Sequence, residues 1–116
     1  MFEPGSTVFW DAIRAIEPSL YKRFNPWDSI TTVPAVEELF AVGGAIPVEA
    51  EVVPGQQELT RPEDFWDIVL GTGYRATVDA LTADQRRAVH DRVVDSVRAE
   101  GLESVRTDFI HASAIR

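Results

Sequence analysis

The stretch RPEDFWDIVLGTGYRATVDAL, residues 61–81, determines how the rest of the chain is interpreted. Thr60 and Glu63 have the spacing of a capping box, and Pro62 suits the first turn of a helix. A helix is therefore expected from about Arg61. Its predicted buried face holds Phe65, Ile68 and Val69.

Two glycines interrupt this stretch. Gly71 and Gly73 are costly inside a helix and permit the positive φ of a C-terminal cap. The first helix should therefore end there, and a second helix should leave at another angle. The apolar residues of this second helix are Tyr74, Val78 and Leu81.

We call Gly71-Thr72-Gly73 the glycine elbow. Large side chains flank it in the sequence, namely Phe65, Trp66, Tyr74 and Arg75. Such a group can line a pocket for a small, partly apolar molecule. The alternative is core packing, which is the usual role of buried aromatic residues. Neither this stretch nor the rest of the sequence contains a catalytic motif that indicates a reaction.

The composition is that of a globular chain with a strong negative charge. Its 116 residues carry a formal charge of −8, and 45% of them are hydrophobic. This length predicts a single domain over residues 1–116. The charge argues against nucleic acid as a partner, because binding a phosphate backbone needs clustered Lys and Arg. The absence of cysteine excludes disulfides, a thiolate nucleophile and cysteine-based metal sites.

The sequence shows no signal for secretion or membrane insertion. Residues 1–7 lack the basic residues and the apolar run of a signal peptide. No apolar stretch approaches the ~20 residues that cross a bilayer. A soluble, cytoplasmic protein with no membrane partner is the expectation.

Three further helices are expected in the first half of the chain. The first runs from about Thr7 to Glu17, and Pro18 separates it from a short helix that follows. Its apolar face consists of Phe9, Ile13 and Ile16. The next helix begins at Pro34 and stops at Gly43-Gly44. Its predicted inward residues are Val36, Leu39 and Phe40.

Two segments have the pattern of strands. Residues 46–53 alternate hydrophobic and polar side chains, which fits a strand with one wet face. Residues 104–115 form the second predicted strand. From Phe109 onward both of its sides are mostly small or apolar, as in a strand that is covered on both faces. This strand is expected to need a neighbour that the sequence does not supply.

The longest helix is expected just before the second strand. Thr82 and Gln85 have capping-box spacing, and Gly101 should end the helix. Its predicted buried residues are Val89, Val93 and Val97. The charged residues between 86 and 98 read as a solvated face without a function.

Few residues in the chain suggest chemistry. His90 is expected on the surface beside Asp91, because one histidine without a second ligand is a poor metal site. His111 is expected to be buried and hydrogen-bonded in its strand, with a general base as the alternative. Arg75 is expected to pair with a nearby acid, although it could also meet an anionic substrate. Asp64 and Asp67 suit the first turn of a helix.

Five segments carry a family resemblance: FEPGS at 2–6, NPWD at 25–28, the helix and glycines at 35–44, EDFWDIVLGTGYR at 63–75 and ASAI at 112–115. In this order they resemble the C-terminal half of a class I S-adenosylmethionine-dependent methyltransferase. The resemblance spans essentially the whole chain, although none of its segments is a sharp catalytic signature.

The resemblance implies an α+β chain whose helices pack on a small antiparallel sheet, with strands at about 46–53 and 104–115. In that family a Rossmann-like, doubly wound sheet has its seventh strand inserted antiparallel between the fifth and the sixth. This chain would retain only the sixth and seventh strands. The missing neighbour of residues 104–115 would then be the fifth strand.

The resemblance carries over no cofactor-binding residue. The family's glycine-rich loop after the first strand is absent, and Gly71-Thr72-Gly73 follows no strand. The chain alone is expected to bind no cofactor and no metal, and S-adenosylmethionine only when a partner completes the fold. The region over the family's substrate end supplies the candidates Phe9, Trp10, Trp27, Phe65, Trp66, Tyr74 and Arg75. A catalytic residue cannot be assigned.

Three functions stay open on this basis. The chain could be the substrate-cap half of a small-molecule methyltransferase that works with a separate cofactor-binding chain. It could instead be a non-enzymatic module that forms homodimers through its strand edge. A free-standing enzyme of unrelated mechanism ranks below both, since no acid–base or nucleophile cluster is visible.

Overall fold

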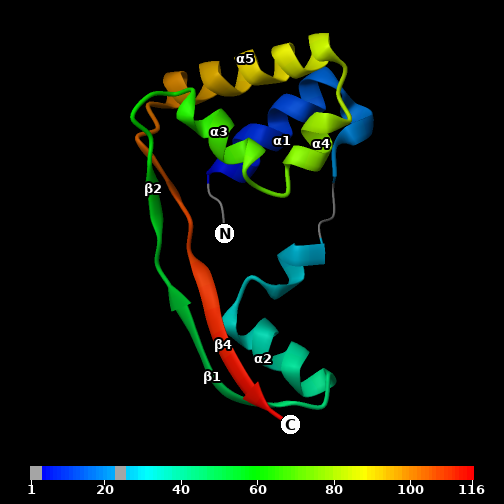
Figure 1. Cartoon of the computed structure of the whole chain (residues 1–116), viewed down its shortest axis with the longest axis vertical. Helices are drawn as coiled ribbons and strands as arrows, with labels where there is room; N and C mark the ends of the chain where they lie inside the picture. Colours follow the sequence, from blue (N-terminus) through cyan, green and yellow to red (C-terminus); the bar gives the residue numbers. More distant parts are fainter. Residues whose placement is uncertain (1–3, 23–25) are drawn as a thin grey trace. The chain divides into compact units, whose positions relative to one another are not determined.

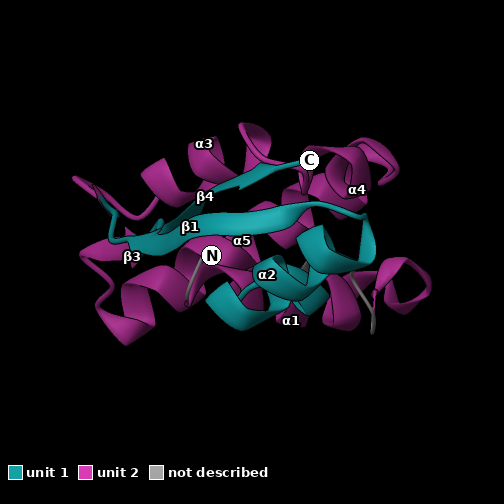
Figure 2. Ribbon diagram, turned by 90° about the horizontal axis from the view of Figure 1, so that it is seen from below, with its two compact units in different colours: residues 1, 23–56, 106–116 teal, residues 2–22, 57–105 magenta. Residues whose placement is uncertain are grey.

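The fold is α+β with small antiparallel pairing, as expected (Figure 1). It was determined as a computed structural model that describes residues 4–22 and 26–116, without the side chain of Trp27. The chain divides into two compact units (Figure 2). Unit 1 comprises residue 1, residues 23–56 and residues 106–116; unit 2 comprises residues 2–22 and 57–105.

Unit 2 is helical and contains the hydrophobic core. Its elements are α1 (Gly5–Ile16), the 3-10 turn η1 (Pro18–Leu20), α3 (Asp64–Leu70), α4 (Arg75–Asp79) and α5 (Ala83–Glu100). Two short strands, β2 (Gln56–Glu58) and β3 (Ser104–Arg106), pair with each other at the unit boundaries. The core cluster draws on every helix of this unit and consists of Val8, Phe9, Ala12, Ile13, Leu59, Phe65, Val69, Val78, Leu81, Val89, Val93, Val97 and Val105.

The predicted signals at the ends of α5 are all present. Thr82 accepts a hydrogen bond from the backbone N–H of Gln85, and the Gln85 side chain accepts one from the Thr82 backbone N–H. The helix ends at Gly101, whose φ of 63° lies in the left-handed region that glycine adopts without strain. The helix packs against α1 and α3 through the predicted valines.

The start of α3 differs from the prediction. No capping box forms between Thr60 and Glu63, and the helix begins at Asp64. The Asp64 carboxylate instead accepts hydrogen bonds from the backbone N–H groups of Thr60 and Arg61, at 2.9 and 3.1 Å. The Asp64 carboxylate therefore satisfies the Thr60 N–H, which the Glu63 side chain would have satisfied in a capping box, and the Arg61 N–H as well.

The glycine elbow does separate two helices, because α3 ends at Leu70 and α4 begins at Arg75. Its backbone differs from the expectation, however. Neither Gly71 nor Gly73 has a positive φ. Among the described glycines, those with a positive φ are Gly44 and Gly101.

In its described residues, unit 1 consists of a 3-10 helix, an α-helix and a two-stranded ribbon. The 3-10 helix η2 (Pro26–Ile30) leads into α2 (Val33–Val42), whose N-cap Thr32 accepts a hydrogen bond from the Ala35 N–H. The ribbon pairs β1 (Ile46–Val53) with β4 (Phe109–Ile115). The pairing is antiparallel, as expected, and α2 lies against both strands.

The predicted inner faces of unit 1 are not buried. Leu39 on α2 is 52% exposed, and no described residue of this unit is fully buried. The predicted apolar face of β1 is likewise exposed, since a register shift between Pro47 and Glu49 breaks the alternation. β4 does alternate, but one of its sides is open, so the expected cover on both faces is absent from the described residues.

The predicted strand 104–115 is two strands, β3 and β4, separated by Thr107 and Asp108. Gly55 lies against this break: Asp108 accepts a hydrogen bond from the Gly55 N–H at 3.0 Å, and Gly55 O accepts one from the Thr107 N–H at 2.9 Å. A Cβ at residue 55 would lie 2.8 Å from the carbonyl oxygen of Thr107, so only glycine fits this approach.

Candidate functional site

An aromatic cluster in unit 2 brings some of the predicted site residues together. The Phe9 and Tyr74 rings stack with centroids 4.7 Å apart, and Trp10 meets Tyr74 edge-on at 5.7 Å. Tyr21 extends the cluster, with its centroid 6.1 Å from that of Trp10 and the Arg14 guanidinium 4.2 Å from its own ring. Stacked and edge-on rings at these distances stabilise packing. The cluster joins the start of α4 to α1.

The other predicted residues lie apart from this cluster. Phe65 is fully buried in the core, which matches the packing alternative. Arg75 is exposed and forms an ion pair with Asp79 at 3.7 Å, as expected. The side chain of Trp27 lies outside what the structure describes.

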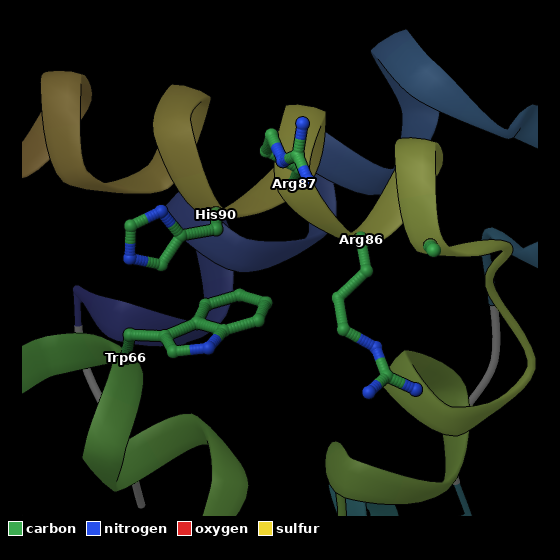
Figure 3. Close-up of a pocket in the computed structure, with 5 residues that line it drawn as sticks. Trp66, Arg86, Arg87 and His90 are labelled. Atoms are coloured by element: carbon green, nitrogen blue, oxygen red, sulfur yellow. The ribbon is translucent and has the colours of Figure 1, made fainter.

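Trp66 lines an open pocket of about 420 Å³ between α3 and the first turns of α5 (Figure 3). We call this the Trp66 pocket. Its lining consists of Trp66, Ala83, Arg86, Arg87 and His90. The His90 ring stands edge-on to the Trp66 indole, with centroids 5.3 Å apart and an interplanar angle of 86°. The pocket therefore combines an aromatic wall with three nitrogen-bearing side chains.

The basic side chains of this pocket differ in their partners. Arg86 is held by Asp79, at 3.7 Å, and donates to the Val78 carbonyl oxygen at 3.5 Å. His90 Nδ1 lies 3.0 Å from a carboxylate oxygen of Asp91. Arg87 has no hydrogen bond or ion pair with any residue that the structure describes. Arg87 is thus the guanidinium most available to a ligand.

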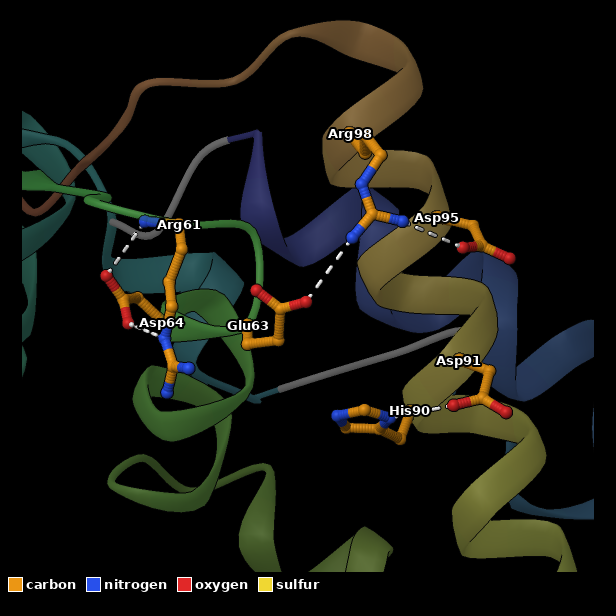
Figure 4. A network of polar contacts seen from close by, with 7 residues as sticks. All are labelled: Arg61, Glu63, Asp64, His90, Asp91, Asp95 and Arg98. Atoms are coloured by element: carbon orange, nitrogen blue, oxygen red, sulfur yellow. Dashed lines mark hydrogen bonds and ion pairs between the residues drawn. The ribbon is translucent and has the colours of Figure 1, made fainter.

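A polar network borders the pocket along α3 and α5 (Figure 4). Arg98 bridges Glu63 at 3.3 Å and Asp95 at 3.6 Å, which ties the start of α3 to the last turns of α5. Arg98 and Asp95 are exposed and Glu63 is partly exposed, so each pair contributes little stability.

Three carboxylates have lowered pKa values because hydrogen bonds favour their charged forms. The pKa of Asp64 falls mainly through its bond from the Arg61 backbone N–H. The pKa of Glu17 falls mainly through the Ser19 side chain, with a further bond from Gln85 of α5. The pKa of Asp108 falls through the Gly55 backbone N–H and then the Arg106 side chain. All three acids hold backbone geometry, and none lines the Trp66 pocket.

A second candidate site is the free side of β4, which we call the β4 edge. In the described residues β4 pairs only with β1, so alternate N–H and C=O groups of residues 109–115 face away from the ribbon. These residues, FIHASAI, include no Asp, Glu, Lys, Arg or Pro. The outer side of β1, by contrast, carries Pro47 and the glutamates 49 and 51, which discourage further pairing.

The structure agrees with the predicted exposure of one histidine and not of the other. His90 is on the surface beside Asp91, as expected. His111 is exposed on the open side of β4, so the prediction of a buried histidine is wrong. That prediction assumed a second covering layer, which the described residues do not contain. Residues 4–22 and 26–116 also hold no group of three or more side chains placed to bind a metal.

The sequence alone does not indicate that basic side chains line a pocket with Trp66. Arg86, Arg87 and His90 were assigned to a solvated face, although their spacing places them on adjacent turns of one helix. The missing information was tertiary: only the packing of α3 on α5 brings Trp66 beside them.

The chain has no match among protein-family models and none among curated proteins. In the part of the chain that the structure describes, no helix has the length and apolar character of a membrane span.

Proposed function

We propose that this chain is the substrate-side half of a class I S-adenosylmethionine-dependent methyltransferase, acting on a small molecule. In this proposal a strand from a cofactor-binding polypeptide pairs with the β4 edge and completes a Rossmann-like sheet. The proposal places the assembly in the cytoplasm, where its cofactor is made. The chain alone is not expected to transfer a methyl group.

The observation that carries the proposal is the antiparallel pairing of β1 with β4, the last strand. The resemblance in sequence implies this pairing. It also implies that the last strand needs a second neighbour, and the β4 edge is uncharged and unpaired within the described residues. The contrast with β1 supports β4 as the interior strand of a larger sheet, since Pro47 and two glutamates suit an outer edge.

The proposal assigns separate work to the two polypeptides. The partner would supply the glycine-rich loop and the acidic residue that hold S-adenosylmethionine. This chain would supply substrate contacts, for which the candidates remain Trp10, Trp27, Phe65, Trp66, Tyr74 and Arg75. Among them Trp10 and Tyr74 are partly exposed members of the aromatic cluster, whereas buried Phe65 would act by positioning its neighbours.

Mixing experiments test this proposal. The chain is combined with a purified polypeptide that carries the first five strands and the glycine-rich loop of a class I methyltransferase. We expect a one-to-one complex in size-exclusion chromatography with light scattering, and S-adenosylmethionine binding that the chain alone lacks. Failure to form a complex at tens of micromolar of each polypeptide would contradict the proposal.

A matched pair of variants shows whether the β4 edge makes the contact. Ser113→Lys puts a charge on exposed β4 and should weaken the complex, because lysine on a strand edge opposes pairing. Glu51→Lys places a lysine on β1 instead, opposite His111, and should leave the complex intact. Equal effects of the two substitutions would argue against docking at β4.

A homodimeric binding module is the second candidate function, and the sequence of β4 favours it specifically. Two antiparallel copies of residues 109–115 centred on Ala112 would place Phe109 opposite Ile115 and His111 opposite Ser113. No like charges would face each other. Sedimentation over a range of concentrations separates the candidates: a tight dimer of the 12.9 kDa chain favours this module, and a monomer favours the methyltransferase half.

A further inference from the structure

We propose that the Trp66 pocket binds a small aromatic carboxylate. The aromatic ring of the ligand would lie beside the Trp66 indole, and its carboxylate would meet the Arg87 guanidinium. The site lies wholly within unit 2, so the proposal does not depend on the assembly at the β4 edge.

The size and the wall of the pocket suit one aromatic ring. A volume of about 420 Å³ lies in the range of small-molecule sites. The half-buried Trp66 indole offers a rigid aromatic surface, which is held in place by the edge-on ring of His90. Ala83 leaves the side toward the start of α5 without a bulky side chain.

The charge of the lining selects an anion. The chain as a whole carries a formal charge of −8, yet the residues that line this pocket include two arginines and no acid. Nearby, Arg86 lies 3.7 Å from Asp79, which also pairs with Arg75, and His90 Nδ1 lies 3.0 Å from Asp91. Arg87 is left without a partner among the described residues, and a bound anion would supply one.

The single available guanidinium favours a monoanion over a phosphate. The planar fork of arginine matches the two oxygens of a carboxylate, and this geometry is stronger and more specific than a point-charge contact. A phosphate dianion would call for a second uncompensated cation. Arg86 is already engaged, because it donates to the Val78 carbonyl oxygen and lies 3.7 Å from Asp79, a carboxylate that it shares with Arg75.

Nuclear magnetic resonance of the whole chain tests the proposal with benzoate, benzamide and acetate as probes. The indole N–H signal of Trp66 is identified from its loss in Trp66→Phe, which separates it from the other two tryptophans. We expect benzoate to shift this signal with a dissociation constant on the order of 1 mM, as suits a nine-atom ligand. Benzamide lacks the charge and acetate lacks the ring, so both should bind at least tenfold more weakly.

Two substitutions on α5 locate the anion. Arg87→Gln should weaken benzoate binding about tenfold, the loss of one charge-assisted contact. Arg92→Gln removes the same charge from an exposed position on α5 outside the pocket lining, and benzoate binding should be unchanged. The proposal is overturned if benzoate leaves the Trp66 signal unmoved, if benzamide binds equally well, or if both variants lose affinity alike.

Discussion

Among single residues, Phe65 is the side chain on which the stability of unit 2 should depend most. It is fully buried and belongs to the core cluster that joins the helices of this unit. Phe65→Ala should lower the free energy of unfolding by about 3–5 kcal/mol, through lost burial and the cavity that remains. Urea unfolding followed by circular dichroism measures this change.

Val42→Ala is the matched control for that prediction. Val42 is 81% exposed, so its truncation should change the free energy of unfolding by no more than about 0.5 kcal/mol. A loss in Phe65→Ala as small as that of the control would show that the core is not packed as described.

The capping carboxylate of Asp64 makes stability depend on pH in a definite direction. Its pKa is lowered from an ordinary value of 3.8, so the unfolded chain binds more protons there than the folded chain. This stabilisation is complete above pH 3.8 and is lost as the pH falls through the folded pKa. Melting temperatures measured from neutral to acidic pH should therefore fall below that point.

Asp64→Asn should lower the melting temperature at neutral pH. It should also make the fall of the melting temperature toward acidic pH less steep. The decline should not vanish, because the pKa values of Glu17 and Asp108 are lowered in the same direction. An unchanged slope in the variant would mean that Asp64 does not hold the start of α3.

Some contacts of single residues could be predicted from the sequence and others could not. Arg75 and Asp79 are four residues apart on one helix, so their ion pair could be predicted. The capping role of Asp64 could not be predicted, because Thr60 and Glu63 have the spacing of a capping box. Which acid binds the backbone N–H groups depends on where the chain enters the helix, and Leu59, buried in the core, fixes that entry.

Among the helices, α5 should be the most sensitive to its end signal. Gly101 has a φ of 63°, where a Cβ is strained, so Gly101→Ala should cost about 1 kcal/mol or more. Gly73→Ala is the control, since this glycine has an ordinary φ and open space around it. Thermal unfolding should show a loss for the first variant only, and equal losses would contradict the assigned cap.

Helices were predictable because their signals are local. The Thr82–Gln85 box and the Gly101 stop lie within the element that they delimit. The strand at 104–115 was predicted without its break, because that break is set by Gly55, far away in the sequence. The exposure of β1 and α2 was also missed, since periodicity indicates an apolar face but not whether anything covers it.

In the whole molecule, buried and exposed apolar residues are divided between the units. Every buried hydrophobic residue of the described chain belongs to unit 2. The large exposed ones all belong to unit 1, and they are Leu39, Val42, Ile46, Val48, Val52, Phe109 and Ile115. Although α2 packs on the two-stranded ribbon, no described residue of unit 1 is fully buried, which supports a partner for this unit.

Hydrogen exchange along β4 tests most directly whether its edge awaits a strand from another molecule. In a dilute monomeric sample, alternate amides among the seven residues 109–115 should exchange rapidly, because those N–H groups face away from β1. Adding the five-strand cofactor-binding polypeptide should protect all of them. Protection of every β4 amide in the monomer, or rapid exchange that persists in the mixture, would contradict the account.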